Sequence, residues 1–374
     1  MNRLVLIGNG FDLAHGMKTS YHDFILNYLK EAFRGVFKGN NYEDNLIKVY
    51  YDRAGWKLIM NGNEVDSWTL QNFIDHFEPE NRRENRVVLQ SKSILIQYLF
   101  DHCKQYDWVD IENVFYLLLC KFASKNQLNE IMRLNQDLEF LKELLKEYLV
   151  KVENDFVKND SEKFRRKDFV EQITSISTLS VQERKYLGIE ELNNRPESIL
   201  FLNFNYTDTI HEYFERIREK INNCYVINIH GKLNESNNPI IFGYGDESET
   251  NFSLLEKYDE CLTYVKTYWY SRTNNYRKFL DFVNSGNFDV FVLGHSCGLS
   301  DKTLLSEVFN NKNCRKIRLL TYVKDRNKDV TIDNTDYISK TYQIGRVFQN
   351  KEEMRDKLIP FMPSDVIAIK SLKN

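Results

Sequence analysis

The stretch Leu4-Val5-Leu6-Ile7-Gly8-Asn9-Gly10-Phe11-Asp12 decides how the N-terminal region folds. Its apolar half predicts a buried strand, and the chain then turns at two glycines and continues as a helix. Glycine reaches backbone angles that other residues avoid, and the first turn of a helix offers unpaired N–H groups to an anion. The stretch therefore favours a site for a nucleotide phosphate, and a tight turn that binds no ligand is the alternative.

The composition is that of an ordinary soluble globular protein, with 42% hydrophobic and 28% charged residues among 374. This length allows two or three domains, or one enlarged domain with an insertion. The formal net charge of -3 provides no overall attraction to phosphate backbones or anionic membranes, so the sequence disfavours nucleic acid and membranes as partners. No apolar run approaches the ~20 residues of a membrane span, and the first run is too short for a secretory signal. We therefore expect a cytoplasmic protein.

The six cysteines lie far apart and include no C-x-x-C pair. This spacing disfavours both a zinc ribbon and a disulfide framework. We therefore expect reduced thiols and no metal site.

Between residues 21 and 195 the apolar residues recur at helical spacing. The clearest run extends from Leu128 to Phe156, where every third or fourth residue is apolar, and it predicts one long amphipathic helix. Further apolar stripes include Tyr50, Tyr51 and Trp68. We expect residues 21–195 to form an all-helical insertion with a core of its own.

After residue 196 the pattern changes to brief β-rich runs separated by polar loops. These runs cover residues 199–202, 225–229, 240–242, 290–293 and 317–322. Short, continuous apolar strands that are buried on both faces are typical of a parallel sheet. Residues 1–20 and 196–374 are therefore predicted to form one α/β core, a Rossmann-like, mostly parallel sheet flanked by helices. The tail from residue 324 is predicted to contain a loop, a strand and a helix near residues 351–358.

Four of the predicted strands end in polar motifs. The motifs are Gly8-Asn9-Gly10-Phe11-Asp12, Asn203-Phe204-Asn205-Tyr206-Thr207-Asp208, His230-Gly231 and Gly294-His295-Ser296-Cys297-Gly298-Leu299-Ser300-Asp301. In an open parallel sheet, such loops gather outside the carboxyl ends of the strands, where ligands bind. Each motif by itself has a structural explanation, such as a helix cap, a turn or a histidine satisfied in the core. Four of them at one edge favour a binding site.

These motifs resemble the AbiH family of bacteriophage abortive-infection proteins. The resemblance rests on Leu-Ile-Gly-Asn-Gly-Phe-Asp-Leu-Ala-His-Gly-Met-Lys-Thr-Ser-Tyr at residues 6–21, on the loops that begin at Phe204 and Ile229, and on Gly294-His295-Ser296 with Ser300-Asp301. It spans most of the chain and is densest at the four loops. The order of the motifs is more distantly similar to the NAD-binding core of sirtuin-like domains in bacterial defence proteins.

Two departures separate this sequence from the deacylase sirtuins. The glycine turn reads Gly8-Asn9-Gly10 in place of Gly-Ala-Gly, and the cysteine-bound zinc module of those enzymes is missing. The departures disfavour peptide deacylation and leave cleavage of NAD open.

The resemblance implies a role for each loop, with NAD as the substrate and no metal. Asn205 would orient the ribose and the attacking water, and His230 would be the base, a role that suits an imidazole with an ordinary pKa of about 6.5. Ser296 and Asp301 resemble adenosine-side contacts. The implied NAD-binding residues are Gly8, Asn9, Gly10, Phe11, Asp12, Tyr206, Asp208, Gly294, His295, Ser296 and Asp301.

Two histidines have open roles, since His15 and His295 either reach the ligand or pack behind the sheet. We expect His295→Ala to cost less activity than His230→Ala. We also expect Gly10→Val to abolish nucleotide binding with little loss of folding, because the added side chain would fill the space through which a phosphate approaches.

Three functions are compatible with this pattern. The first is an anti-phage effector that hydrolyses NAD, and the second is a toxin that acts on another nucleotide or on nucleic acid. The third is a sensor that binds a nucleotide without turnover. The expected partners are NAD or a related nucleotide, together with a second copy of the chain or another defence protein.

Overall fold

The computed structural model describes residues 1–51, 64–76, 87–106, 110–159, 167–174, 195–245 and 251–367. The chain forms two compact units. The sheet unit comprises Met1–Met17, Leu149–Glu249 and Val265–Asn374, and the insert unit comprises Lys18–Tyr148 and Thr250–Tyr264. These units are defined by how compactly their residues pack together. The domain boundaries at residues 20 and 196 stay a prediction.

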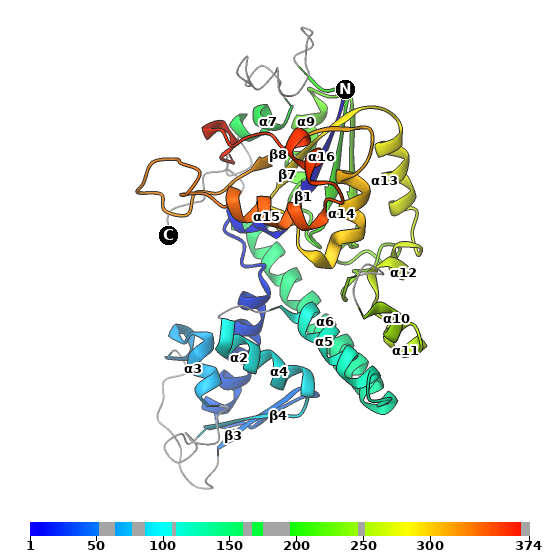
Figure 1. Cartoon of the computed structure of the whole chain (residues 1–374). Helices are drawn as coiled ribbons and strands as arrows, with labels where there is room; N and C mark the ends of the chain where they lie inside the picture. Colours follow the sequence, from blue (N-terminus) through cyan, green and yellow to red (C-terminus); the bar gives the residue numbers. More distant parts are fainter. Residues whose placement is uncertain are drawn as a thin grey trace. The chain divides into compact units, whose positions relative to one another are not determined.

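The sheet unit is built on a parallel sheet (Figure 1). Within the described ranges it has five strands, in the order β6-β5-β1-β7-β8. Their bounds are β1 (Asn2–Ile7), β5 (Ser198–Asn203), β6 (Asn223–Asn228), β7 (Phe288–Leu293) and β8 (Cys314–Leu320). The first strand lies in the middle, where Leu4 is in register with Leu200 on one side and with Val290 on the other. The predicted α/β class, with a mostly parallel sheet flanked by helices, is confirmed.

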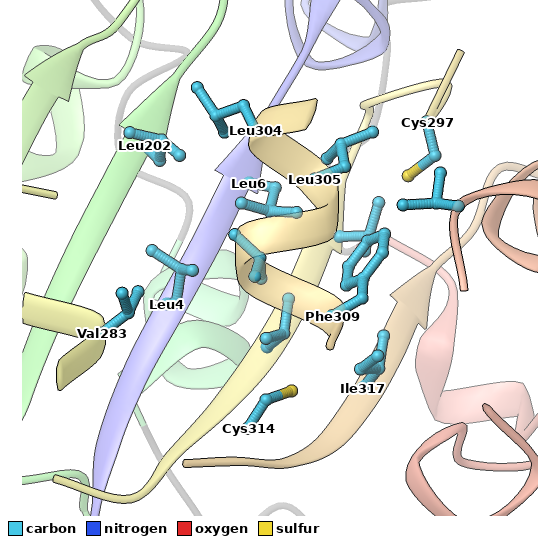
Figure 2. Packing of buried hydrophobic residues seen from close by; sticks show 14 of the residues in the cluster. Leu4, Leu6, Leu202, Val283, Cys297, Leu304, Leu305, Phe309, Cys314 and Ile317 are labelled. Atoms are coloured by element: carbon cyan, nitrogen blue, oxygen red, sulfur yellow. The ribbon is translucent and has the colours of Figure 1, made fainter. Parts of the chain in front are cut away.

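Alternate side chains of the strands enter two different cores. On one face, Leu4 and Leu6 belong to a cluster with the apolar side of three helices, α13 (Asn275–Asn284), α14 (Lys302–Phe309) and α15 (Tyr337–Val347). Figure 2 shows Leu6 beside Leu304 and Leu305 of α14, with Leu4 further along the strand. On the other face, Val5 and Ile7 pack with α1 (Asn9–Ala14), α7 (Lys167–Thr174) and α9 (His211–Arg218). Burial on both faces explains why the three central strands, β5, β1 and β7, are mostly apolar.

The insert unit contains a sheet, so the expectation that residues 21–195 are all-helical is wrong. In the part of this unit that the structure describes, three antiparallel strands pair in the order β2-β3-β4. They are β2 (Tyr42–Glu43), β3 (Ile47–Tyr51) and β4 (Val87–Ser91). Tyr50 and Tyr51, which we assigned to a helical stripe, lie in β3. Asp44 forms the turn before β3, because its carboxylate accepts hydrogen bonds from the backbone N–H groups of Leu46 and Ile47.

The other regular elements in the described part of the insert unit are helices. They are α2 (Tyr21–Phe37), η1 (Glu64–Ser67), α3 (Leu70–Asp75), α4 (Ile94–Tyr106), α5 (Ile111–Ala123), the first part of α6 (Leu128–Asn159), α10 (Phe252–Leu255) and α11 (Asp259–Leu262). The predicted long helix is confirmed as α6, whose Ile131, Leu134, Leu138 and Leu141 are fully buried.

Two predicted strands of the sheet unit are absent from the described structure. Residues 240–242 form a loop in which the backbone N–H of Ile241 donates to the carbonyl of His230 at 2.7 Å. The tail contains helix α15 where a strand was expected, and it is followed by the expected helix, α16 (Lys351–Lys357). Both errors concern short apolar runs, for which periodicity separates strand from helix poorly.

None of the helices in the described ranges is long and apolar enough to cross a membrane. The six cysteines are free thiols, as expected.

Candidate functional site

The loops that follow β1, β5, β6 and β7 meet at the carboxyl edge of the sheet. The strand order reverses at β1, since β5 and β6 lie on one side of it and β7 and β8 on the other. Ligands of open α/β sheets bind at such a reversal. Backbone bonds tie the loops together, from Gly10 N to the Gly294 carbonyl at 2.9 Å and from Phe204 N to the Ile7 carbonyl at 2.9 Å. The structure therefore brings the four predicted motifs together.

Three glycines allow the backbones of the loops after β1 and β7 to pack directly against each other. A Cβ at Gly8 would lie 2.5 Å from the Cα of His295, and one at Gly10 would lie 2.8 Å from the carbonyl oxygen of Gly294. Gly294 has a φ of +72, and a Cβ there would lie 2.3 Å from the backbone nitrogen of Phe11. The glycines therefore serve first to pack loop against loop. The expectation that Gly10→Val spares folding is wrong, because the added side chain would collide with the backbone of Gly294.

Tyr322, just beyond the end of β8, covers the same glycines. Its ring lies 3.2 Å from the position of a Cβ on Gly10, and its hydroxyl lies 3.0 Å from that of a Cβ on Gly294. This hydroxyl is buried and has no hydrogen-bond partner in the structure. The four residues Gly8, Gly10, Gly294 and Tyr322 are called the glycine half of the edge below.

Asp301 is the centre of a second group, the histidine half, which also contains His230, His295 and Lys266. Oδ1 of Asp301 lies 3.0 Å from Nζ of Lys266 and 3.3 Å from Nε2 of His230. Its Oδ2 lies 3.5 Å from Nε2 of His295. The side chain of Asp301 is 11% exposed, and the other three are buried more completely. Among the described residues, no group of His, Cys, Asp or Glu side chains is placed to hold a metal ion.

A backbone hydrogen bond fixes the proton position on neutral His295. The N–H of Cys297 donates to Nδ1 of His295 at 2.9 Å, so that nitrogen is the acceptor and Nε2 carries the proton. The Nε2–H then faces Asp301. Cys297 has a φ of 56, a strained angle for a residue with a side chain, and this turn aims its N–H at the imidazole.

His230 differs from His295 in having one nitrogen without a partner among the residues that the structure describes. Its Nε2 lies 3.0 Å from the hydroxyl of Tyr270 and near Asp301, and no described residue bonds to its Nδ1. The ring of Tyr270 stacks on His230 at 6.1 Å and 11°, and Phe204 contacts both imidazoles edge-on. With the proton on Nε2, the lone pair of Nδ1 is available to accept another proton.

The electrostatics of the histidine half favour a neutral His230 beside a charged Asp301. Burial lowers the pKa of His230, and Asp301 acts in the opposite direction. Burial also acts to raise the pKa of Asp301, but Lys266 and His230 hold it well below its ordinary value. An imidazole that is neutral near pH 7 and oriented by a carboxylate is the arrangement of a general base.

Asn205 ties the β5 loop to the glycine turn. Its Nδ2 donates to the carbonyl of Gly8 at 3.1 Å, and its backbone N–H donates to Oδ1 of Asn203 at 3.1 Å. Its neighbour Tyr206 donates its hydroxyl to the carbonyl of Ile241 at 3.0 Å. Both side chains therefore hold loops in place, and Asn205 lies against the predicted phosphate turn.

The side chains of two predicted residues have partners outside both halves of the edge. The ring of Phe11 lies in the core behind the sheet, against Phe169 and Tyr213. Asp208 forms an ion pair with Lys232 through Oδ2 at 2.7 Å, and its Oδ1 lies 3.2 Å from Nε2 of His211. Phe11 therefore contributes its backbone alone to the glycine turn.

His15 is a structural histidine. Its Nδ1 lies 2.7 Å from the carbonyl of Phe11, and its Nε2 lies 2.6 Å from the hydroxyl of Tyr213. Both nitrogens are occupied and the side chain is buried, so His15 packs behind the sheet. Of the two histidines with open roles, His295 is the one that reaches the site.

Asp12 is a buried carboxylate next to the glycine half. Its Oδ2 accepts a hydrogen bond from the hydroxyl of Thr207, and its Oδ1 has no hydrogen-bond partner in the structure. Burial raises the pKa of Asp12 to about 6. Two predicted residues remain. Asn9 is partly exposed, and Ser296 is exposed.

The profile of a family described as bacteriophage abortive infection AbiH matches residues 4–323. The chain belongs to the AbiH family. The matched region includes all four loops of the edge, and the AbiH resemblance of the motifs is thereby confirmed. None of the curated proteins compared with the chain matches it.

Sequence reasoning missed three residues of this AbiH site, namely Lys266, Tyr270 and Tyr322. The first two lie on α12 (Lys266–Tyr270), in a segment where three of five residues are aromatic. A lysine that begins such an apolar segment could have indicated a site residue, because an ammonium group that is buried requires a charged or polar partner. Tyr322 follows the last strand directly, and its position at the carboxyl edge was a signal of the same kind as the four motifs.

Proposed function

We propose that this AbiH protein is an abortive-infection effector that hydrolyses NAD and releases nicotinamide. Membership of the family indicates a role in phage abortive infection. The observation that carries the enzymatic proposal is His230, which is buried, oriented by Asp301 and without a partner at Nδ1 among the described residues. It lies at the edge of the sheet where ligands of this fold class bind.

The fold is proposed to be Rossmann-like, and more distantly sirtuin-like. The support is the strand order, in which the first strand is central and the direction of winding reverses beside it. This order is that of doubly wound sheets that bind dinucleotides.

The proposed reaction converts NAD and water to nicotinamide and ADP-ribose. The bond between ribose C1′ and the nicotinamide nitrogen breaks, and its electron pair stays with nicotinamide. The oxygen of water bonds to C1′, and Nδ1 of His230 takes the proton of the water. Asp301 stabilises the resulting imidazolium through Nε2–H.

The remaining loops are proposed to position the nucleotide. Asn9 and Ser296 carry polar side chains on the accessible part of the edge and would contact phosphate and ribose oxygens. Asn205 would orient the ribose and the water, because its Nδ2 bond to the carbonyl of Gly8 places its side chain against the glycine turn. Positioning of this kind is a large part of the catalytic effect in such sites.

The test incubates the purified full-length chain with NAD and measures the released nicotinamide by chromatography. Because effectors of this type can require a trigger, NAD is also measured in phage-infected cells that express the chain. His230→Gln should reduce release at least ~100-fold, the usual effect of losing a general base, while the protein stays folded. His211→Gln is the matched control, because His211 is 40% exposed and lies outside the histidine half.

The alternatives give different outcomes in the same experiment. Degradation of another nucleotide or of RNA, with NAD intact in infected cells, would support the toxin. Tight binding of NAD with no product would support the sensor. Equal nicotinamide release by the parent and His230→Gln would exclude His230 as the base.

A further inference from the structure

Lys266 is a buried cation with a specific partner in the histidine half. Its side chain is 3% exposed, and Nζ lies 3.0 Å from Oδ1 of Asp301. Its backbone N–H donates to the carbonyl of Tyr244 at 3.2 Å, which fixes the start of α12. Burying an ammonium is costly even when it is paired, and a well-packed apolar residue is often as good for stability. A structural role therefore explains this lysine poorly.

The same oxygen of Asp301 serves Lys266 and His230. The ammonium and Nε2 of His230 both lie within 3.3 Å of Oδ1, so the two groups are close to one another. A cation at this distance favours the carboxylate form of Asp301 and opposes a second positive charge on the imidazole. Lys266 thus acts on both members of the proposed base.

The described titratable groups of the histidine half come from three parts of the fold. Helix α12 supplies Lys266, which pairs with Asp301, and Tyr270, whose hydroxyl lies 3.0 Å from Nε2 of His230. The loop after β6 supplies His230, and the loop after β7 supplies His295. Protonation of either imidazole adds a positive charge near the ammonium of Lys266 in a buried site.

We propose that Lys266 is a positioning residue of the AbiH site, which holds Asp301 as a carboxylate between the two imidazoles and keeps His230 unprotonated near neutral pH. This role rests on the proposed function for its catalytic meaning, but the effect on His230 is measurable without any substrate. The direction agrees with the electrostatics: after burial, Asp301 and Lys266 are the next influences on the pKa of His230, and Lys266 lowers it.

The test follows the titration of His230 by NMR in the full-length chain with labelled histidine, where His230→Gln assigns the signal. In Lys266→Met the midpoint of His230 should rise by about one pH unit, a tenfold increase in proton affinity, because the opposing charge is gone. Lys266→Arg should keep the midpoint close to that of the parent. Lys232→Met is the matched control, since Lys232 pairs with Asp208 outside the histidine half.

The second readout is the pH profile of nicotinamide release. The acid limb should move to higher pH in Lys266→Met by the same amount as the midpoint. A shifted midpoint in a chain that releases no nicotinamide would overturn the proposed function and support the role of Lys266. An unshifted midpoint in folded Lys266→Met would overturn the role of Lys266, whatever the activity.

A second pair of variants tests the proposal if Lys266→Met does not fold. Replacing both partners, with Asp301→Asn and Lys266→Met together, removes the buried ion pair without leaving a lone charge. The midpoint of His230 should be higher in this double variant than in Asp301→Asn alone, because the single variant keeps the ammonium. Equal midpoints in the two variants would reject the proposal.

Discussion

The glycine half and the histidine half of the carboxyl edge are built on opposite principles. In the glycine half, backbone packs against backbone so closely that a single Cβ at Gly294 would lie 2.3 Å from a main-chain nitrogen. In the histidine half, long titratable side chains converge on one buried carboxylate. The loop after β7 contributes to both, through Gly294 on one side and through His295 and Asp301 on the other.

This difference separates stability from proton chemistry within one edge. The glycine half sets the distance between the loops after β1 and β7, and it holds no charged side chain. The histidine half depends on that spacing, because His295 directly follows Gly294. Substitutions in the glycine half should therefore act mainly on folding, and substitutions in the histidine half should act mainly on activity and pH dependence.

The largest effect is expected for Gly294→Ala. The new Cβ meets backbone atoms, and the φ of +72 disfavours any side chain, so we expect a loss of about 4 kcal/mol in the free energy of unfolding. Urea denaturation followed by circular dichroism measures it. Gly298→Ala is the control on the same loop, because its nearest neighbour would be Oγ of Ser296 at 3.6 Å, and it should change stability by less than about 0.5 kcal/mol. Equal stabilities of the two variants would remove the structural basis of the glycine half.

Asp12 offers a test of charge beneath the glycine half. Because its pKa rises from 3.8 to about 6 on folding, the folded chain holds the proton more tightly between these values, and stability falls as pH rises from 3.8 to 6. Asp12→Asn should remove this loss and stabilise the chain at pH 7.5 by up to about 3 kcal/mol. The gain should shrink as pH falls from 6 towards 4. Urea denaturation across this range checks the slope, and parallel curves for parent and variant would show that Asp12 does not titrate there.

A smaller effect is expected for His295→Gln, and it is read as activity. Nδ1 of His295 is occupied by the N–H of Cys297, and its Nε2 faces Asp301, so neither nitrogen is open to substrate. We expect a loss of nicotinamide release of roughly tenfold, against at least ~100-fold for His230→Gln. A larger loss in His295→Gln than in His230→Gln would identify His295 as the base, with the site still at the same edge of the sheet.

The smallest effect is expected for Tyr322→Phe. The buried hydroxyl of Tyr322 has no hydrogen-bond partner among the described residues, so its removal should stabilise the chain by about 1 kcal/mol. Tyr270→Phe is the counterpart in the histidine half, where the hydroxyl lies 3.0 Å from His230, and it should destabilise the chain by a similar amount. Thermal unfolding of both variants decides the comparison. Loss of stability in both would mean that the hydroxyl of Tyr322 is satisfied by a bound group.

The sequence by itself determined the α/β core of the fold and the edge of the sheet at which the candidate site was predicted. Leu4 to Ile7, residues 199–202 and residues 290–293 are apolar at every position, and such strands are stable in water when helices cover both faces. The glycines and polar residues that end these strands mark the carboxyl edge, because strand ends and turns are encoded by neighbouring residues. The edge and its four loops followed from these local signals.

The tertiary structure decided which of the polar residues act together. His15, His230 and His295 are alike in sequence, yet two hydrogen bonds make His15 structural, while His230 keeps one nitrogen open. Lys266 reaches Asp301 across 35 positions of the chain. The strand pairing of β3 with β4 joins segments that are similarly far apart, and it escaped prediction for the same reason. Periodicity and turn chemistry report on neighbours in sequence, whereas the burial, partner and proton affinity of a side chain depend on residues that only folding brings near.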